Sequence, residues 1–337
     1  MSNAPAARLR ERIDFLQSTP LLAATGRVMH DDTTDRVLGA VLGLALGDAF
    51  GAPHEGGVLE RALWAVLGTR NGKRRWTDDT QMTIDVIESL LACRHIDQDD
   101  LARRFAQSYR WSRGYGPGAA NVLKRIRNGV YWESAALAAF PGGSFGNGGA
   151  MRAPVVGLFY AADSDDDLAG AASDVAAITH AHPLGREGAM LIALATATAF
   201  NDVGSLEIIT RLRHRCESRE YAERIGKAGA WLERGDIISP RRLAAELGNG
   251  IAAIASCPTA VYVALAFRER PFDELLEFTI AMGGDVDTIA AMASAIWGAA
   301  RGFSQLPRAR LQQLEQQERL ERLAQALAGV VVANRSE

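Results

Sequence analysis

Two stretches of this sequence bring together the oxygen ligands that hard divalent cations prefer. Each places two carboxylates and a threonine hydroxyl at the start of an apolar run with helical spacing, and they lie more than 200 residues apart: Thr77, Asp78 and Asp79 in "WTDDTQM", and Asp285, Asp287 and Thr288 in "GGDVDTIAAM". Mg²⁺ favours octahedral oxygen coordination that includes one or two carboxylates. The six side chains therefore predict a site for two Mg²⁺ ions.

An ordinary structural role would explain either stretch on its own. Threonine and aspartate are favoured N-caps, and acidic side chains in a first turn interact well with the helix dipole. Carboxylates gathered at one buried spot repel one another, however, so two such helix starts together would need cations. The acidic runs at 163–167 and 97–100 lack the glycine and the distant glutamate of a calcium loop, which favours solvated capping turns there.

A glycine-rich stretch and a histidine pair are further candidates. "GGSFGNGGAMRAP" places glycines before an apolar helical run, so its backbone N–H groups could receive an anion, although a plain loop has the same composition. His180 and His182 in "ITHAHPLG" are two residues apart and do not share a helix face, which argues against an HExxH type of zinc site. Partly buried structural histidines remain an alternative for both.

Composition excludes several classes of protein. The 337 residues carry a formal net charge of −3 and 23% charged residues, without the basic stripe that nucleic-acid binding needs. Three cysteines (Cys93, Cys216 and Cys257) are widely separated, so neither a disulfide framework nor a zinc knuckle is indicated. No signal peptide is evident, and the apolar run before Asp48 falls short of the ~20 residues that span a bilayer. A soluble, cytoplasmic protein is expected.

The apolar spacing predicts an all-α fold. Almost every segment repeats apolar residues at intervals of three and four, and strand-like alternation is nearly absent. No linker divides the chain, so residues 36–330 are expected to form one compact helical domain. Residues 1–35 are expected to form an N-terminal extension, either a packed terminus or a partner-binding arm.

Seven motifs together resemble the signature blocks of the ADP-ribosylglycohydrolase family, in the family's order, over about residues 36–305. They are "GAVLGLALGDAFGAPHE", "WTDDTQM", "GYGPG", "SFGNGGAMRAP", "ITHAHPLGREGA", "CPTAVYVAL" and "GGDVDTIAAMASAIWGA". The resemblance implies a compact all-α domain, a single orthogonal helical bundle with a central binuclear metal site. Its two Mg²⁺ ions, or Mn²⁺, would be held by the six residues above. It also implies candidate catalytic roles for Glu55, Asp78 and Asp287, with Glu55 or Asp78 assisting proton transfer.

The same resemblance implies a binding site for ADP-ribose. The diphosphate would lie on the loop Ser144–Met151, and the ribose on the loop 114–116. His180, rather than His182, would contact the ligand. The substrate-binding residues implied are Gly114, Tyr115, Gly116, Ser144, Phe145, Gly146, Asn147, Gly148, Gly149, Met151 and His180.

The implied activity is hydrolysis of the bond between ADP-ribose and a modified protein side chain, with ADP-ribosyl-arginine as the first expectation. The Gly-Tyr-Gly loop also occurs in members that act on serine linkages, and a free ADP-ribose conjugate is a third substrate class. Two other roles stay open: an immunity protein that also binds an ADP-ribosyltransferase toxin through residues 1–35, and a non-enzymatic family member. The six intact acidic and hydroxyl positions argue against the last.

Overall fold

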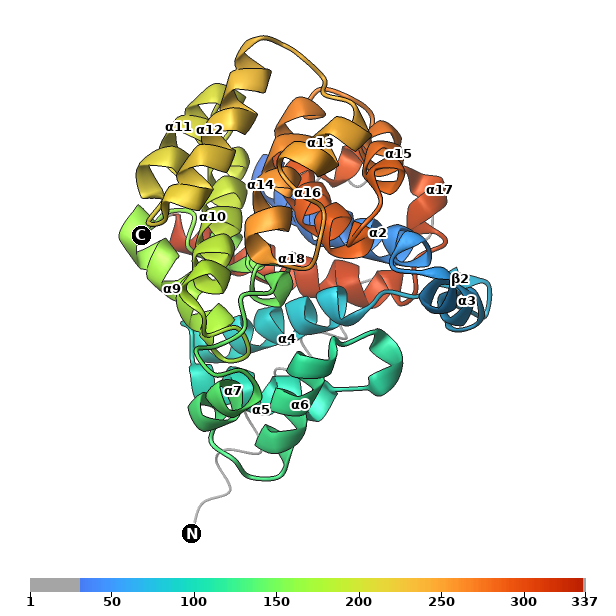
Figure 1. The fold of residues 1–337 in the computed structure, drawn as a ribbon, viewed down its shortest axis with the longest axis vertical. Coiled ribbons are helices and arrows are strands. Elements are labelled where there is room, and N and C mark those ends of the chain that lie inside the picture. The colour runs from blue at the N-terminus through green and yellow to red at the C-terminus, as the bar shows by residue number, and fades with distance from the viewer. Residues whose placement is uncertain (1–30, 336–337) are drawn as a thin grey trace. The chain divides into compact units, whose positions relative to one another are not determined.

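The structure is a computed structural model that describes residues 31–335. Residues 1–30 of the expected N-terminal extension lie outside this described part. Asp31–Glu337 form one unit by their contacts, and the predicted division at residues 35 and 36 falls within the first described helix, α2 (Asp32–Gly51). Figure 1 shows this unit as helices joined by loops, which confirms the predicted all-α fold.

The helices are short to medium in length, and loops rich in glycine separate them. After α2 they are η1 (Ala52–His54), α3 (Val58–Leu67), α4 (Asp78–Cys93), α5 (Gln98–Ser108), η2 (Trp111–Arg113), α6 (Pro117–Arg127), α7 (Trp132–Ala139), η3 (Asn147–Gly149), α8 (Pro154–Phe159), α9 (Asp165–Ala177), α10 (Pro183–Phe200), α11 (Ser205–Arg215), α12 (Arg219–Glu233), α13 (Pro240–Glu246), α14 (Ala253–Ala266), α15 (Phe272–Met282), α16 (Val286–Arg301), η4 (Phe303–Gln305), α17 (Arg308–Leu311) and α18 (Gln317–Asn334).

One small hairpin interrupts the helices. Within the described residues, the only named strands are β1 (Thr69–Arg70) and β2 (Lys73–Arg74), which pair antiparallel with Thr69 opposite Arg74. Asn71 and Gly72 both have positive φ, as expected of an Asn-Gly hairpin turn. Arg74 also exchanges backbone hydrogen bonds with Gln313 and Glu315, so the hairpin leads the chain into α4 along the C-terminal segment.

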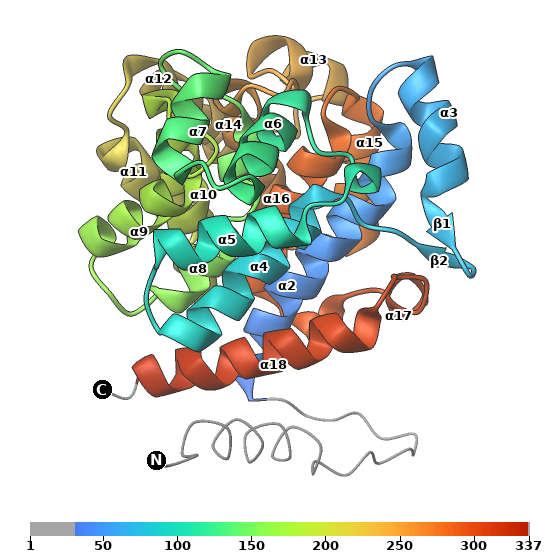
Figure 2. The ribbon, with the colours of Figure 1, turned by 90° about the horizontal axis from the view of Figure 1, so that it is seen from below.

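Helices α2 and α16 pack unusually closely at the centre of the fold (Figures 1 and 2). Glycines recur every fourth residue on one face of α2, which is the spacing that keeps side chains on one face of a helix. A Cβ atom at Gly47 would lie 2.3 Å from the carbonyl oxygen of Ala290, and one at Gly51 would lie 2.7 Å from Cα of Asp287. The glycine face therefore brings the C-terminal end of α2 against the first turn of α16.

The apolar part of α2 extends past Asp48, where the sequence analysis ended it. With the 3₁₀ turn that follows, Asp32–His54 is the one described helix long and apolar enough to cross a membrane by length and composition alone. The interruption at Asp48 does not shorten it, because this carboxylate is satisfied inside the fold by α4. Since 89% of its apolar window is buried, α2 has the surroundings of a core helix.

Candidate active site

The start of α4 is organised by a carboxylate on α2. Thr77 is the N-cap of α4 and accepts the N–H of Asp79, as its sequence context predicted. Asp48, fully buried, accepts the backbone N–H groups of Thr77 at 2.9 Å and of Thr80 at 3.0 Å, and the Thr80 hydroxyl at 2.5 Å. Asp48 was not predicted as a site residue, although a lone carboxylate within an apolar helix indicates a specific buried partner.

The start of α16 is held by a glycine turn. Gly283 and Gly284 have φ values of 69° and 83°, a left-handed conformation that glycine adopts without strain. Asn249 supports the turn by donating from its side-chain amide to the carbonyls of Met282 and Gly283, and its own carbonyl accepts the N–H of Asp285 at 2.8 Å. Asp285 is thereby fixed as the N-cap residue of α16.

The two helix starts meet at one buried cluster, as the sequence predicted. Carboxylate oxygens of Glu55, Asp285 and Asp287 lie within 4.8 Å of one another, and the Thr288 hydroxyl donates to Asp79 at 3.4 Å. These residues line one wall of a cavity of about 240 Å³, together with Asp78. The expected juxtaposition of α4 and α16 is therefore present in the fold.

Burial and mutual repulsion keep the pKa values of this cluster high. Burial raises the pKa of Asp78 well above its usual range, and the charges of Asp48 and Glu55 raise it further. The pKa of Asp287 is raised by burial first and then by Glu55 and Asp285. The pKa of Asp79 is also raised, by burial first and then by the charges of Asp48 and Asp78. Such a cluster is costly in its charged form unless a cation compensates it.

The donor set fits hard divalent cations. Oδ2 of Asp79 is buried and has no hydrogen-bond partner, which is rare for a carboxylate oxygen in a folded protein. The surrounding donors are carboxylate and threonine oxygens, the chemistry that Mg²⁺ and Mn²⁺ prefer. An acidic cluster with an unused buried oxygen is therefore a candidate metal centre.

The glycine-rich loop forms a second wall of the same cavity. Its 3₁₀ turn, η3, is fixed by backbone hydrogen bonds from Asn147 to Ile251 and from Ala253 to Phe145. The Asn147 side chain donates to Asp285 at 2.5 Å, which couples the loop to the acidic cluster. A side chain at Gly148 would collide with the His180 ring, since its Cβ would lie 2.6 Å from Cε1. Glycine here lets the histidine lie against the loop backbone.

The two histidines of "ITHAHPLG" have different surroundings. His182 is the N-cap of α10 and its Nδ1 accepts the N–H of Leu184. His180 lines the cavity, and burial lowers its pKa to about 3, so its imidazole is neutral at physiological pH. Of the two histidines, only His180 lines this cavity.

Most of the predicted site residues line this one cavity. They are Glu55, Asp78, Asp79, Gly114, Gly116, Ser144, Gly146, Asn147, Gly148, Met151, His180, Asp285, Asp287 and Thr288. Four predicted residues do not line it. Thr77 is a buried cap, Tyr115 is buried with its hydroxyl unpartnered, Gly149 packs against Ala176, and Phe145 is exposed with its ring near His182.

Apolar residues at the edge of the cavity escaped sequence analysis. Phe140 and Ile251 line the cavity although both are exposed, Ile251 to 71%. Phe140 lies so close to Gly118 that a Cβ there would be 2.2 Å from its ring. Exposed apolar side chains beside a polar cavity are typical of ligand sites, but isolated hydrophobic residues in loops give no sequence signal.

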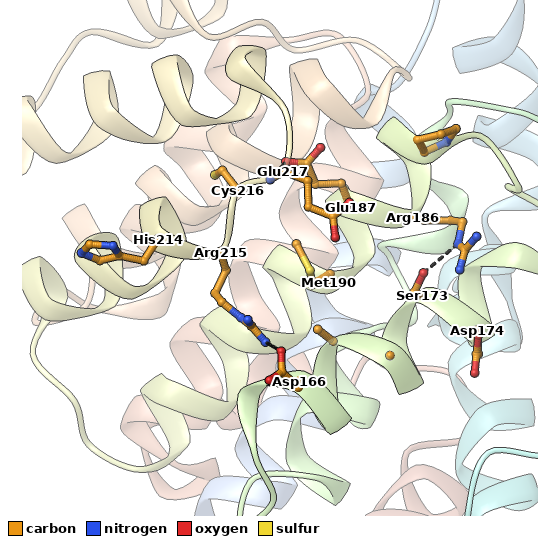
Figure 3. Close-up of a pocket in the computed structure, with 13 residues that line it drawn as sticks. Asp166, Ser173, Asp174, Arg186, Glu187, Met190, His214, Arg215, Cys216 and Glu217 are labelled. Atoms are coloured by element: carbon orange, nitrogen blue, oxygen red, sulfur yellow. Dashed lines mark hydrogen bonds and ion pairs between the residues drawn. The ribbon is translucent and has the colours of Figure 1, made fainter.

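A larger cavity of about 620 Å³ lies elsewhere, between α9, α10 and the loop from α11 to α12. Its charged groups already serve the fold: Glu187 accepts the backbone N–H groups of Glu217 and Ser218, and Arg215 pairs with Asp166 at 2.5 Å. Figure 3 shows that pair and the bond from Arg186 to Ser173. None of the predicted site residues lines this cavity, so the smaller one is the candidate active site.

The two other acidic runs are helix caps, as expected. Ser164 accepts the N–H of Asp167 at the start of α9, and Asp97 accepts the N–H of Asp100 at the start of α5.

Comparison with known proteins identifies the family of this chain. The family model for ADP-ribosylglycohydrolase matches residues 29–337. ADP-ribosylhydrolase ARH3 from Mus musculus is 38% identical over 87% of this chain and 90% of its own length, and ARH3 from Homo sapiens is 37% identical over 87% and 92%. A solved ADP-ribosylglycohydrolase-related protein complex superposes with a TM-score of 0.66 at 27% identity, covering 89% of this chain and 99% of that one.

The chain therefore belongs to the ADP-ribosylglycohydrolase family. Its α-helical fold is the fold of that family. Membership places the chain in a family of glycohydrolases that act on ADP-ribosylated substrates.

Proposed function

We propose that this protein is a Mg²⁺-dependent hydrolase that removes ADP-ribose from modified protein side chains. The observation that carries the proposal is the single cavity in which an acidic cluster, a glycine-rich loop and a neutral histidine face one another. The acidic cluster suits the ribose end of the ligand and its metals, and the loop and histidine suit the diphosphate. Family membership supports the same chemistry.

The proposed metal ligands are those the sequence named: Thr77, Asp78, Asp79, Asp285, Asp287 and Thr288. When bound, Mg²⁺ supplies positive charge that polarises nearby water and hydroxyl oxygens. Asp48 and Asn249 hold the two helix starts in register. Asn147 fixes the orientation of Asp285 by its amide hydrogen bond. The residues around the cluster thus preorganise it before the substrate arrives.

Glu55 is the proposed general base. It follows η1, lines the cavity and lies within the acidic cluster without belonging to either helix start. In the proposed reaction a water attacks C1 of the terminal ribose, and Glu55 accepts its proton. The bond from C1 to the acceptor side chain breaks, and the acceptor takes up one proton as it leaves, which equals the proton that Glu55 took from the water and returns. The carboxylates around the ribose stabilise positive charge that develops at C1.

ADP-ribosyl-arginine is the first proposed substrate and ADP-ribosyl-serine the second. The second is favoured by one feature of the cavity: the loop 114–116 contributes Gly114 and Gly116 to its wall and no acidic side chain that could recognise a guanidinium. A toxin-binding role was predicted only from residues 1–35, which lie almost wholly outside the described part.

Release of ADP-ribose from an ADP-ribosyl-arginine protein and from an ADP-ribosyl-serine peptide tests the proposal. Wild type and Glu55→Gln would be compared in Mg²⁺ and in EDTA, with the exposed Glu318→Gln as the matched control. We expect Mg²⁺-dependent release from one of the two substrates, lost in Glu55→Gln and retained in Glu318→Gln. No release from either substrate by wild type in Mg²⁺ would rule out the proposed activity.

A further inference from the structure

A buried arginine is linked through one threonine hydroxyl to the histidine that lines the cavity. Arg152, in the short segment between η3 and α8, is fully buried, and among the described residues it forms no ion pair. Its guanidinium instead donates to the carbonyls of Gly148 at 2.6 Å and Val175 at 2.8 Å, and to the Thr179 hydroxyl at 3.0 Å. Burial lowers the pKa of Arg152 to about 9, so it stays protonated at neutral pH.

Arg152 thus connects the glycine-rich loop to the end of α9. Gly148 belongs to the wall of the cavity, whereas Val175 lies in α9 and Thr179 follows it. The guanidinium cannot accept a hydrogen bond, so at each contact it is the donor. The hydroxyl oxygen of Thr179 is therefore the acceptor in its hydrogen bond with Arg152.

The Thr179 hydroxyl accepts from Arg152 and still has its own proton to donate. Its oxygen lies 2.8 Å from Nδ1 of His180, and no other acceptor for it is present among the described residues. If Nδ1 were protonated, the hydroxyl oxygen would accept from both neighbours and its own proton would be buried without a partner, which is costly. The arrangement that satisfies both the hydroxyl and the ring nitrogen has the hydroxyl donating to an unprotonated Nδ1.

A neutral imidazole with Nδ1 unprotonated carries its proton on Nε2. The low pKa of His180 keeps the ring neutral, and Nε2 lies 3.2 Å from the position of a Cβ at Gly146, against the loop. Nε2 has no protein hydrogen-bond partner among the described residues, and His180 lines the cavity.

We propose that Arg152 and Thr179 are positioning residues that fix His180 in its Nε2–H tautomer, as a permanent uncharged donor toward an anionic oxygen of ADP-ribose. The donor is available over the whole neutral pH range, because no proton has to be gained. Glycine at 146 and 148 leaves room for the His180 ring to lie against the loop. This inference deepens the proposed function and rests on it for the identity of the ligand.

The tautomer can be read directly from the ligand-free wild-type protein. Long-range ¹H–¹⁵N spectra of protein labelled at histidine distinguish protonated from unprotonated ring nitrogens, and His180→Gln assigns the signals. We expect an unprotonated Nδ1 and a protonated Nε2 for His180, unchanged from about pH 5 to about pH 8. A protonated Nδ1, or a ring that titrates in this range, would overturn the proposal without any variant.

Two variants at Thr179 separate positioning from packing. Thr179→Val removes the hydroxyl at nearly constant shape, and Thr179→Ser keeps it. We expect Thr179→Val to shift the His180 tautomer toward Nδ1–H. It should also weaken binding of free ADP-ribose about tenfold by calorimetry, which corresponds to the loss of one hydrogen bond to a charged group. Thr179→Ser should preserve both the tautomer and the affinity. Equal tautomers and equal affinities in the two variants would contradict the proposal.

These measurements are independent of turnover. The spectra use no ligand, and ADP-ribose binding requires no cleavage. If the protein released no ADP-ribose from modified substrates while the tautomer and binding results were as expected, the proposed function would fail and the positioning role would stand. Normal turnover together with a protonated Nδ1 in wild type would support the proposed function and refute the positioning role.

Discussion

The carboxylate of Asp48 on α2 accepts the backbone N–H of Thr77, the N-cap of α4, with both of its oxygens, at 2.9 and 3.0 Å. The glycine face of α2 presses the same helix against α16. One helix therefore sets the positions of both acidic helix starts. The site depends on α2 although α2 contributes no proposed metal ligand.

Asp48→Asn should weaken the start of α4. Oδ2 of Asp48 accepts from the N–H groups of Thr77 and Thr80, and Oδ1 accepts a second time from Thr77. In the asparagine variant an NH₂ group replaces one of these oxygens and faces a buried N–H donor, at a cost of about 1–3 kcal/mol. Denaturant unfolding with and without Mg²⁺ measures this cost, and we also expect weaker Mg²⁺ binding. Glu318→Gln on the exposed face of α18 is the control. An Asp48→Asn protein as stable as that control would disprove the structural role.

Gly47→Ala should be strongly destabilising. The new Cβ would lie 2.3 Å from the Ala290 carbonyl oxygen, and both atoms belong to packed helices that must separate, at a cost of about 1–3 kcal/mol or more. Gly170→Ala in α9 is the matched control, because a Cβ there meets nothing within 4 Å. That change should stabilise by about 0.5–1 kcal/mol through helix propensity. Thermal unfolding of the two variants should move in opposite directions.

Asp85 should make stability depend on pH. Burial raises the pKa of Asp85 to about 7 from its ordinary 3.8, so between these values the folded protein binds more protons than the unfolded chain. The free energy of unfolding should then fall as pH rises through this window, by at most about 1.4 kcal/mol per unit.

Asp85→Asn should flatten that slope, since the amide has no proton to lose. Unfolding would be measured from about pH 5 to about pH 8 in saturating Mg²⁺, so that the acidic cluster contributes little. The exposed Asp236→Asn serves as the control. Parallel slopes for wild type and Asp85→Asn would show that Asp85 is ionised throughout.

Metal binding should release protons and strengthen with rising pH. The pKa values of Asp78, Asp79 and Asp287 are raised in the metal-free protein, first by burial, and bound Mg²⁺ requires their charged forms. Calorimetric titration with Mg²⁺ in buffers of different ionisation enthalpy counts the protons. Affinity that does not change with pH, with no proton released, would contradict the cluster as the binding site.

The sequence predicted the helical fold and the meeting of "WTDDTQM" with "GGDVDTIAAM" because periodicity and capping are local properties that survive folding. It did not predict the supports. Asp48 reads only as an interruption of an apolar helix, and Arg152 as a lone charge between a glycine-rich loop and an apolar run, because their partners include distant backbone groups. Tyr115 was expected at the ribose, yet it is buried beside Tyr109.

The central claim is that the acidic cluster holds divalent metal. Anomalous X-ray diffraction from crystals grown with Mn²⁺ tests it most directly. We predict anomalous density in the cavity between the first turns of α4 and α16, within coordination distance of Asp79 Oδ2, and its loss in Asp287→Ala. Well-ordered crystals with no anomalous density at this position would contradict the account.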